Sequence, residues 1–365
     1  MKMSRLYSLG RLPLLALGMV SLAAGVWAGL GKLEWVPNGD FSAFPAQHGP
    51  LMAAGFLGTL ISLERAVALG RAWGYMGPLL SGVGAAALAA APSAQIGGIL
   101  SLAGSLAFVF TSLALMRRQS SAFTVILTLG AACLFAGTAF WVFADWHFRI
   151  VLWWIAFLFL TIVGERFELS QFAFASQSAP LKSAAAAFGA AFIAGAALTS
   201  ADLLIGVRLC GAAMAFFAAW LLRYDVANRN LRQPGLPGFI SACLVPGYAW
   251  LLVSGLILAW KAPTESGLLY DAALHAVFLG FAVSMIFGHA ALILPAITGF
   301  ALKYRPSFYA HLALLHAGLL VRVAAGVAGS EPGRRWGALL NALAFVLFLA
   351  NTVRSAILSA RSRDQ

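Results

Sequence analysis

The chain has 365 residues, of which 61% are hydrophobic and only 10% are charged, and its formal net charge is +12. A soluble domain is about half apolar and about a quarter charged, so this composition excludes an ordinary soluble protein and a disordered chain. Its apolar runs are continuous rather than alternating, which excludes a membrane β-barrel. We therefore predict an all-α, polytopic membrane bundle that forms a single integral membrane domain over residues 1–365.

Apolar stretches long enough to cross a bilayer, about 20 residues each, recur along the whole chain and predict about twelve spans. They cover residues 11–31, 48–69, 73–92, 96–116, 122–144, 149–168, 183–200, 201–222, 238–260, 270–294, 306–328 and 335–357. The first span follows a basic N-terminal segment. Its apolar run is longer than the roughly 7–15 residues of a signal peptide, so we interpret it as a true span.

The excess of positive charge is explained by the loops between the spans. Arginine and lysine gather in alternate short loops, such as the one that contains Arg117 and Arg118, and at both chain ends. The positive-inside rule then places both termini in the cytoplasm. Because the basic residues do not form one continuous face, nucleic acid is not expected as a partner.

Charged residues recur near the predicted cytoplasmic ends of two spans, as Glu64-Arg65 in the second and Glu165-Arg166 in the sixth. Adjacent residues on a helix point about 100° apart, so the two members of a pair are not expected to contact each other. A charged group inside a bilayer costs a few kcal/mol. We therefore expect these residues to pair with charges of other helices, or to line a proton or ion route.

Two histidines occupy matching depths on this topology. His48 opens the second span at the outer surface, and His275 lies near the outer end of the tenth. Neutral imidazole is a common ligand of haem iron and also suits copper. The two residues are therefore candidate haem ligands, and the alternative is that they are interfacial histidines hydrogen-bonded to backbone or headgroups.

Three further histidines lie deeper in the spans. His289 follows His275 by 14 residues, which in an α-helix is ~40° short of four full turns and ~21 Å along the axis, so the two cannot bind one metal ion. His311 and His316 differ by five residues and point to different faces of the eleventh span. Each deep histidine needs a partner, either a metal or a structural hydrogen bond.

One arginine lies well inside the eleventh span. Arg322 is suited either to a haem propionate or to a carboxylate of the protein. Asp271, near the outer end of the tenth span, is a candidate partner for Arg322 or for an N–H of His275.

Spans two, six and ten are separated by four helices each. A histidine stands at the outer end of each one, namely His48, His147 and His275. This spacing indicates a threefold pseudo-repeat of four-helix units.

Three segments carry a resemblance to a known family. They are HGPLMAAGF at 48–56, ALHAVFLGFAVSMIFGHA at 273–290 and LLHAGLLVRVAAG at 314–326. With the helix count, they resemble the NnrS family, membrane proteins of about twelve spans that are associated with bacterial nitric oxide stress, haem and copper. That family is similar to the catalytic subunit of haem-copper oxidases, which has a threefold arrangement and a low-spin haem held by histidines of its second and tenth spans.

The resemblance implies a haem b held by His48 and His275 in the bacterial inner membrane, with nitric oxide or oxygen as ligand. It makes His289, His311 and His316 candidates for a second haem or for copper. The sequence also departs from the pattern, because no adjacent His-His pair or His-x-His element is present. Apolar residues also follow GHA at 288–290, where the family's element continues with threonine, glycine and arginine. Enzyme activity, catalytic residues and oligomeric state are therefore left open.

The alternative function is a proton- or ion-coupled secondary transporter. Twelve spans, intramembrane glutamate and arginine, and helices interrupted at Pro246-Gly247 and Pro295 are typical of that class.

Overall fold

The structure is a computed structural model that describes residues 10–36, 43–92, 95–144, 147–170, 179–263 and 266–361. Within this part of the chain all regular structure is helical, and ten helices are long and apolar enough to cross a membrane. This confirms a multi-pass helical membrane protein. The predicted spans 73–92 and 183–200 correspond to the shorter α5 (Met76–Ala90) and to α9 (Ala179–Leu198), so the count of twelve stays a prediction.

The chain divides into two compact units, which are described one at a time. Unit 1 comprises residues 1–172 together with 297–299, and unit 2 comprises residues 173–296 together with 300–365.

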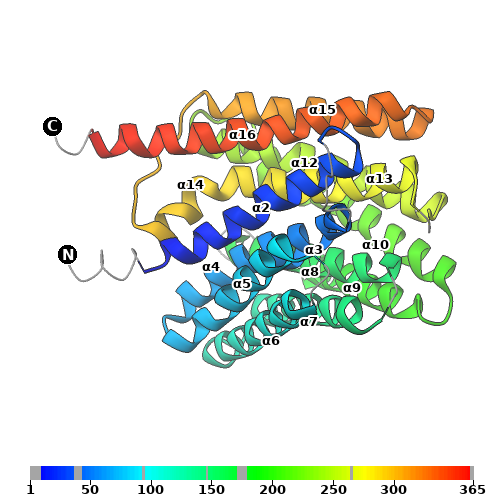
Figure 1. The fold of residues 1–365 in the computed structure, drawn as a ribbon, viewed down its shortest axis with the longest axis horizontal. Coiled ribbons are helices and arrows are strands. Elements are labelled where there is room, and N and C mark those ends of the chain that lie inside the picture. The colour runs from blue at the N-terminus through cyan, green and yellow to red at the C-terminus, as the bar shows by residue number, and fades with distance from the viewer. Residues whose placement is uncertain are drawn as a thin grey trace. The chain divides into compact units, whose positions relative to one another are not determined.

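Unit 1 contains a broken helix that begins near His48, and Figure 1 labels two of its segments, α3 and α4. This helix packs against α2 and α5, α6 packs against α5 and α7, and α7 packs against α8. The elements are α2 (Leu12–Lys32), η1 (Phe44–Gln47), α3 (His48–Pro50), η2 (Leu51–Leu57), α4 (Gly58–Leu69), η3 (Ala72–Tyr75), α5, α6 (Gln95–Arg118), α7 (Ala122–Phe143) and α8 (His147–Ser170).

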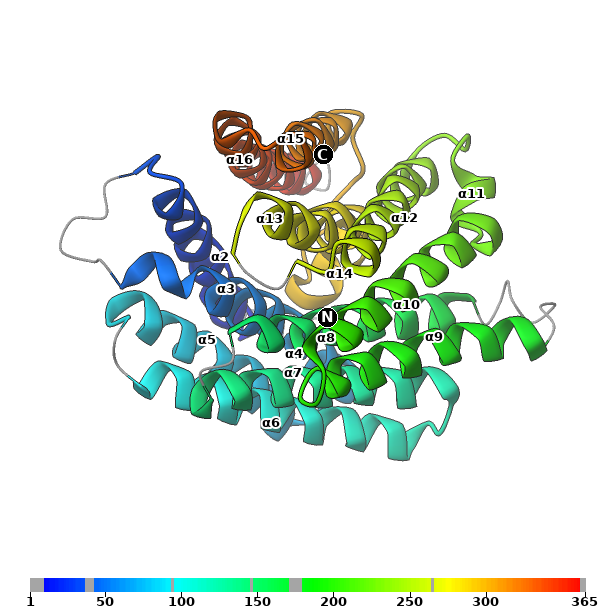
Figure 2. The same cartoon turned by 90° about the vertical axis from the view of Figure 1, so that its right-hand side faces the viewer.

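Unit 2 has a similar broken helix that contains His275. It packs against α12 and α15, and Figure 2 shows α15 and α16 lying side by side. The elements are α9, α10 (Leu203–Tyr224), α11 (Ala227–Asn230), α12 (Leu236–Trp260), α13 (Leu268–His275), η4 (Ala276–Val283), α14 (Ser284–Thr298), α15 (Phe308–Ala328) and α16 (Glu331–Arg361).

Local sequence signals explain several helix ends. Ser121 caps α7, because its hydroxyl accepts from the backbone N–H of Thr124 while the Thr124 side chain accepts from the Ser121 N–H. Asp202 caps α10 by accepting from the N–H of Ile205 at 2.9 Å. Gly70 ends α4 at φ 64°, a left-handed conformation that favours glycine.

Burial varies along the chain with a period of four spans. In the spans that contain α4, α8 and α14, 61%, 78% and 72% of the most apolar stretch is buried, against 33–50% in the other seven of the ten. These are spans two, six and ten of the sequence analysis. The pattern is the one that a threefold repeat of four-helix units produces, and the repeat itself stays a prediction.

Two spans are not α-helical throughout, contrary to the sequence expectation. In each, a π-helical segment follows the histidine, η2 after His48 and η4 directly after His275. A π-turn shifts the backbone bonding by one residue and is frequent at functional sites. Serines of the preceding helices help to satisfy carbonyls there: Ser21 Oγ donates to Leu51 O at 2.7 Å and Ser254 Oγ to Ala273 O at 2.8 Å.

Candidate functional site

The His48 imidazole is fixed by helix α2. Its Nδ1 lies 2.7 Å from the carbonyl oxygen of Gly25, and because a carbonyl can only accept, Nδ1 carries the proton. The ring lies so close to Gly29 that a Cβ there would meet Nδ1 at 2.8 Å. The geometry therefore sets one tautomer, in which the lone pair is on Nε2, the form that metal-bound histidines adopt when their other nitrogen donates to a carbonyl.

His275 has the same arrangement within its own unit. Its Nδ1 donates to the carbonyl oxygen of Asp271 at 2.8 Å, one turn earlier on α13, which again leaves the lone pair on Nε2. The carboxylate of Asp271 is also near, with Oδ1 3.4 Å from His275 Nδ1. A histidine backed by a carboxylate is a common arrangement behind metal ligands.

Arg322 of α15 pairs with this carboxylate. Its Nε and Nη2 each donate to one oxygen of Asp271 at 2.7 Å, and the two side chains are only 8% and 13% exposed. The expected pairing of Asp271 with Arg322 is thus confirmed. Since the guanidinium is engaged by a protein carboxylate, the structure favours that partner over a haem propionate.

His289 also has its proton on Nδ1, which donates to Met285 O at 2.8 Å. The angle and axial distance calculated from the sequence for His275 and His289 assumed an α-helix between them. Eight of the intervening residues form η4, which turns the chain by less per residue than an α-helix does. The ~40° angle and ~21 Å axial distance calculated for His275 and His289 in an α-helix therefore do not apply.

His316 is held by hydrogen bonds on both ring nitrogens. Trp250 Nε1 donates to Nδ1 at 3.0 Å, so the proton of the neutral ring is on Nε2, which lies 3.3 Å from Ser284 Oγ. Ser284 in turn donates to Cys243 O at 2.7 Å. This chain connects α12, α14 and α15, and a metal at His316 would have to displace one of its members.

His311 lies in an aromatic cage. The ring is 1% exposed, its Nδ1 accepts from Asn351 at 3.2 Å, and its Nε2 has no hydrogen-bond partner among the described residues. The rings of Phe239, Phe287, Phe308 and Phe348 surround it at centroid distances of 4.9–6.1 Å. The Phe287 ring is perpendicular to the imidazole of His311 at a centroid distance of 4.9 Å, a geometry in which an N–H can donate to an aromatic face. The cage is a structural explanation for this histidine.

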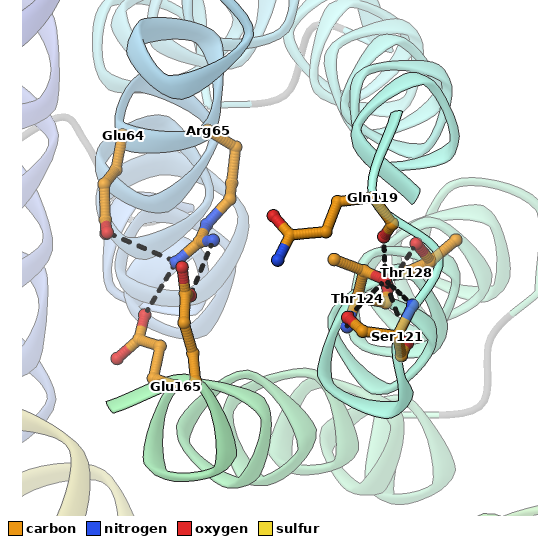
Figure 3. A network of polar contacts seen from close by, with 8 residues as sticks. Glu64, Arg65, Gln119, Ser121, Thr124, Thr128 and Glu165 are labelled. Carbon is orange, nitrogen blue, oxygen red and sulfur yellow. Dashed lines mark hydrogen bonds and ion pairs between the residues drawn. The ribbon is translucent and has the colours of Figure 1, made fainter. Parts of the chain in front are cut away.

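Several charged residues of unit 1 form one cluster around Arg65 (Figure 3). Its guanidinium lies 3.3 Å from Glu64, 3.6 Å from Glu165 and 3.5 Å from Glu168. The expected pairing between helices is confirmed, since Glu165 is on α8. The expectation that Glu64 and Arg65 would not contact each other was wrong, because the long arginine side chain bends back toward its neighbour. Arg166 is also buried, at 7% exposure.

Within the described residues no group of three or more His, Cys, Asp or Glu side chains is close enough to hold a metal ion. Copper therefore has no evident donor set of that size in this part of the chain. The side chain of His147 lies outside the described residues.

A family described as a domain of unknown function (DUF8744) matches residues 11–357. The chain belongs to this family. No curated protein and no solved structure matches it. The matched region contains both histidine sites and the Arg65 cluster, and the resemblance to NnrS stays a prediction.

Sequence reasoning missed several contacts of these residues. Gly25, Gly29 and Trp250 were not identified as partners of histidines, although glycines spaced four apart on one helix are a signal for close approach of another group. The π-helical segments were missed as well.

Proposed function

We propose that this protein is a haem-binding, multi-pass membrane protein of the bacterial inner membrane, with His48 and His275 as iron ligands. The observation that carries the proposal is their shared setting, since a π-helical segment follows each of them, η2 after His48 and η4 after His275. Both rings donate Nδ1–H to a backbone carbonyl, at 2.7 and 2.8 Å, and so both have the lone pair on Nε2. His289 has the same Nδ1 bond but no such segment after it among the described residues. Haem, when bound, would supply redox and gas-binding chemistry. A role in nitric oxide metabolism and copper as a second cofactor rest on the sequence resemblance alone.

The residues of the chain itself would prepare these ligands before any haem arrives. Carbonyl hydrogen bonds prevent the rings from rotating and exclude the tautomer that cannot bind through Nε2.

A visible spectrum of the purified protein, from cells supplied with haem, tests the proposal. We expect a Soret band and, after dithionite, sharp α and β bands of six-coordinate iron. His48→Ala and His275→Ala should each abolish the six-coordinate spectrum. His316→Ala is the matched control, because both nitrogens of His316 are engaged by protein groups and its loss should leave the spectrum unchanged. A featureless spectrum of the wild type, or unchanged spectra of both ligand variants, would contradict the proposal.

A secondary transporter is the second candidate. The Arg65 cluster favours it, because Glu64, Glu165 and Glu168 surround one buried arginine within a membrane protein, an arrangement found along ion and proton routes. Proton- or sodium-driven solute flux into proteoliposomes, abolished by Glu165→Gln and retained by His275→Ala, would establish this function instead.

A further inference from the structure

The Arg322–Asp271 ion pair is a buried charge pair of unit 2, with side chains that are only 8% and 13% exposed. Replacing a buried ion pair with apolar residues is often neutral or stabilising, so stability alone is a weak reason for its presence in an apolar span. Charged residues inside membranes usually serve a functional group nearby. Here the nearby group is the His275 ring, whose Nδ1 is 3.4 Å from Asp271 Oδ1.

We propose that this ion pair orients the His275 imidazole and sets how strongly its Nε2 donates to a bound iron. The inference rests on the proposed haem function. Asp271 contacts the ring in two ways, since its backbone oxygen accepts from Nδ1 at 2.8 Å and its carboxylate stands beside the same nitrogen. The carboxylate is positioned by the fork from Arg322, and the backbone oxygen by helix α13.

The two charges act on the ring in opposite directions. An uncompensated carboxylate beside Nδ1–H would strengthen that hydrogen bond, increase electron donation from Nε2 and stabilise ferric iron. Arg322 cancels most of this effect by taking both carboxylate oxygens. Arg334 of α16 adds positive charge toward Asp271, but it is itself paired with Glu331. Asp271 and Arg322 are thus positioning residues, and neither would touch the iron.

The test is a charge cycle on the haem-loaded protein, read as the midpoint potential. Asp271→Asn leaves the positive charge and should raise the potential, whereas Arg322→Gln leaves the negative charge and should lower it. The double variant Asp271→Asn/Arg322→Gln removes both charges and should return to the wild-type value. Arg208→Gln, an exposed arginine of α10, is the matched control and should not shift the potential. The proposal is overturned if the two single variants shift the midpoint potential in the same direction, or if neither shifts it.

A second readout needs no haem. In protein labelled with ¹⁵N-histidine, the His275 Nδ1–H signal, assigned by its loss in His275→Gln, should move downfield in Arg322→Gln and upfield in Asp271→Asn. If protein from cells supplied with haem contains no haem and still shows these shifts, the haem function is refuted and the orienting role stands. If the haem spectrum depends on His275 but the midpoint potential is the same in all the charge variants, only the role of the ion pair is overturned.

A single variant that leaves one buried charge is at risk of not folding. Arg322→Lys then replaces it, because lysine keeps the charge and loses the planar fork. We expect the wild-type potential together with a broadened or divided His275 Nδ1–H signal. A sharp wild-type signal from this variant would overturn the orienting role.

Discussion

The close approach of α2 to His48 makes Gly29→Ala an informative substitution. A Cβ on Gly29 would lie 2.8 Å from Nδ1 and 2.9 Å from Cε1 of the imidazole, well inside ordinary van der Waals contact. The ring must therefore move away from α2, and its 2.7 Å hydrogen bond to Gly25 O cannot survive unchanged. We predict that the variant loses the fixed orientation of His48.

The magnitude follows from three contributions. Alanine is about 1 kcal/mol better than glycine inside a helix, which would stabilise the variant. A broken hydrogen bond that leaves a buried polar group unsatisfied costs about 1–3 kcal/mol. Overpacking in a tight interior costs about another 1–3 kcal/mol. The expected result is a net destabilisation of about 1–5 kcal/mol, together with loss of the six-coordinate haem spectrum.

The matched control lies on the same helix. A Cβ on Gly18 would meet Thr59 Cγ2 at 3.5 Å, an ordinary contact, so Gly18→Ala should be neutral or slightly stabilising. Both variants are compared by thermal unfolding in detergent and by the reduced visible spectrum. Equal unfolding temperatures for the two variants, or a normal haem spectrum for Gly29→Ala, would refute the reasoning about this contact.

Two further predictions concern buried polar contacts. Trp250→Phe removes the donor to His316 Nδ1 and should destabilise the protein by about 1–3 kcal/mol. The control is Trp260→Phe on the same helix, at a side chain that is 77% exposed, which should change stability by less than about 0.5 kcal/mol. Equal thermal midpoints for these two variants would contradict the assigned hydrogen bond. Arg65→Gln removes the buried arginine that the half-buried carboxylates of Glu64 and Glu165, 28% and 23% exposed, share, and should cost about 1–3 kcal/mol. Glu168→Gln, at a side chain that is 45% exposed, should cost less than about 1 kcal/mol. Comparable losses in thermal unfolding would show that Arg65 is not the centre of the cluster.

The membrane fold could be predicted because its signal is compositional. Long apolar runs with charges between them allow few alternatives, and ten of the predicted spans are present as spanning helices in the described residues. The π-helical segments could not be predicted in the same way. The stretch AVFLGFAV at 276–283 is apolar at nearly every position, so it has no periodicity that could distinguish a π-turn from an α-turn.

The charged contacts of the candidate site were partly predictable. Asp271 and Arg322 are charges within apolar spans of unit 2, and the cost of leaving either unpaired made their contact a reasonable expectation. The Glu64–Arg65 contact was missed, since the reasoning used the directions of Cβ atoms and ignored the length of the arginine side chain.

The partner of His316 was beyond the sequence. Trp250 lies 66 residues earlier, and its indole would have suited a membrane interface equally well. The two side chains meet because α12 and α15 both pack against the broken helix of unit 2.

The π-helical segments distinguish His48 and His275 from a third histidine at the start of a buried span. Span six, α8, begins at His147, and 78% of its most apolar stretch is buried, yet it remains α-helical from His147 to Ser170. Burial alone therefore does not produce the π-turn in this chain. The segments instead follow His48 and His275, and in both cases a serine of the preceding helix donates to a carbonyl close by. His289 shares the Nδ1 bond to a carbonyl, but no π-helical segment follows it in the described part of the chain. Because the same local backbone arrangement occurs in two spans eight helices apart, a shared chemical task is a better explanation than chance, and the iron ligation proposed above is one such task.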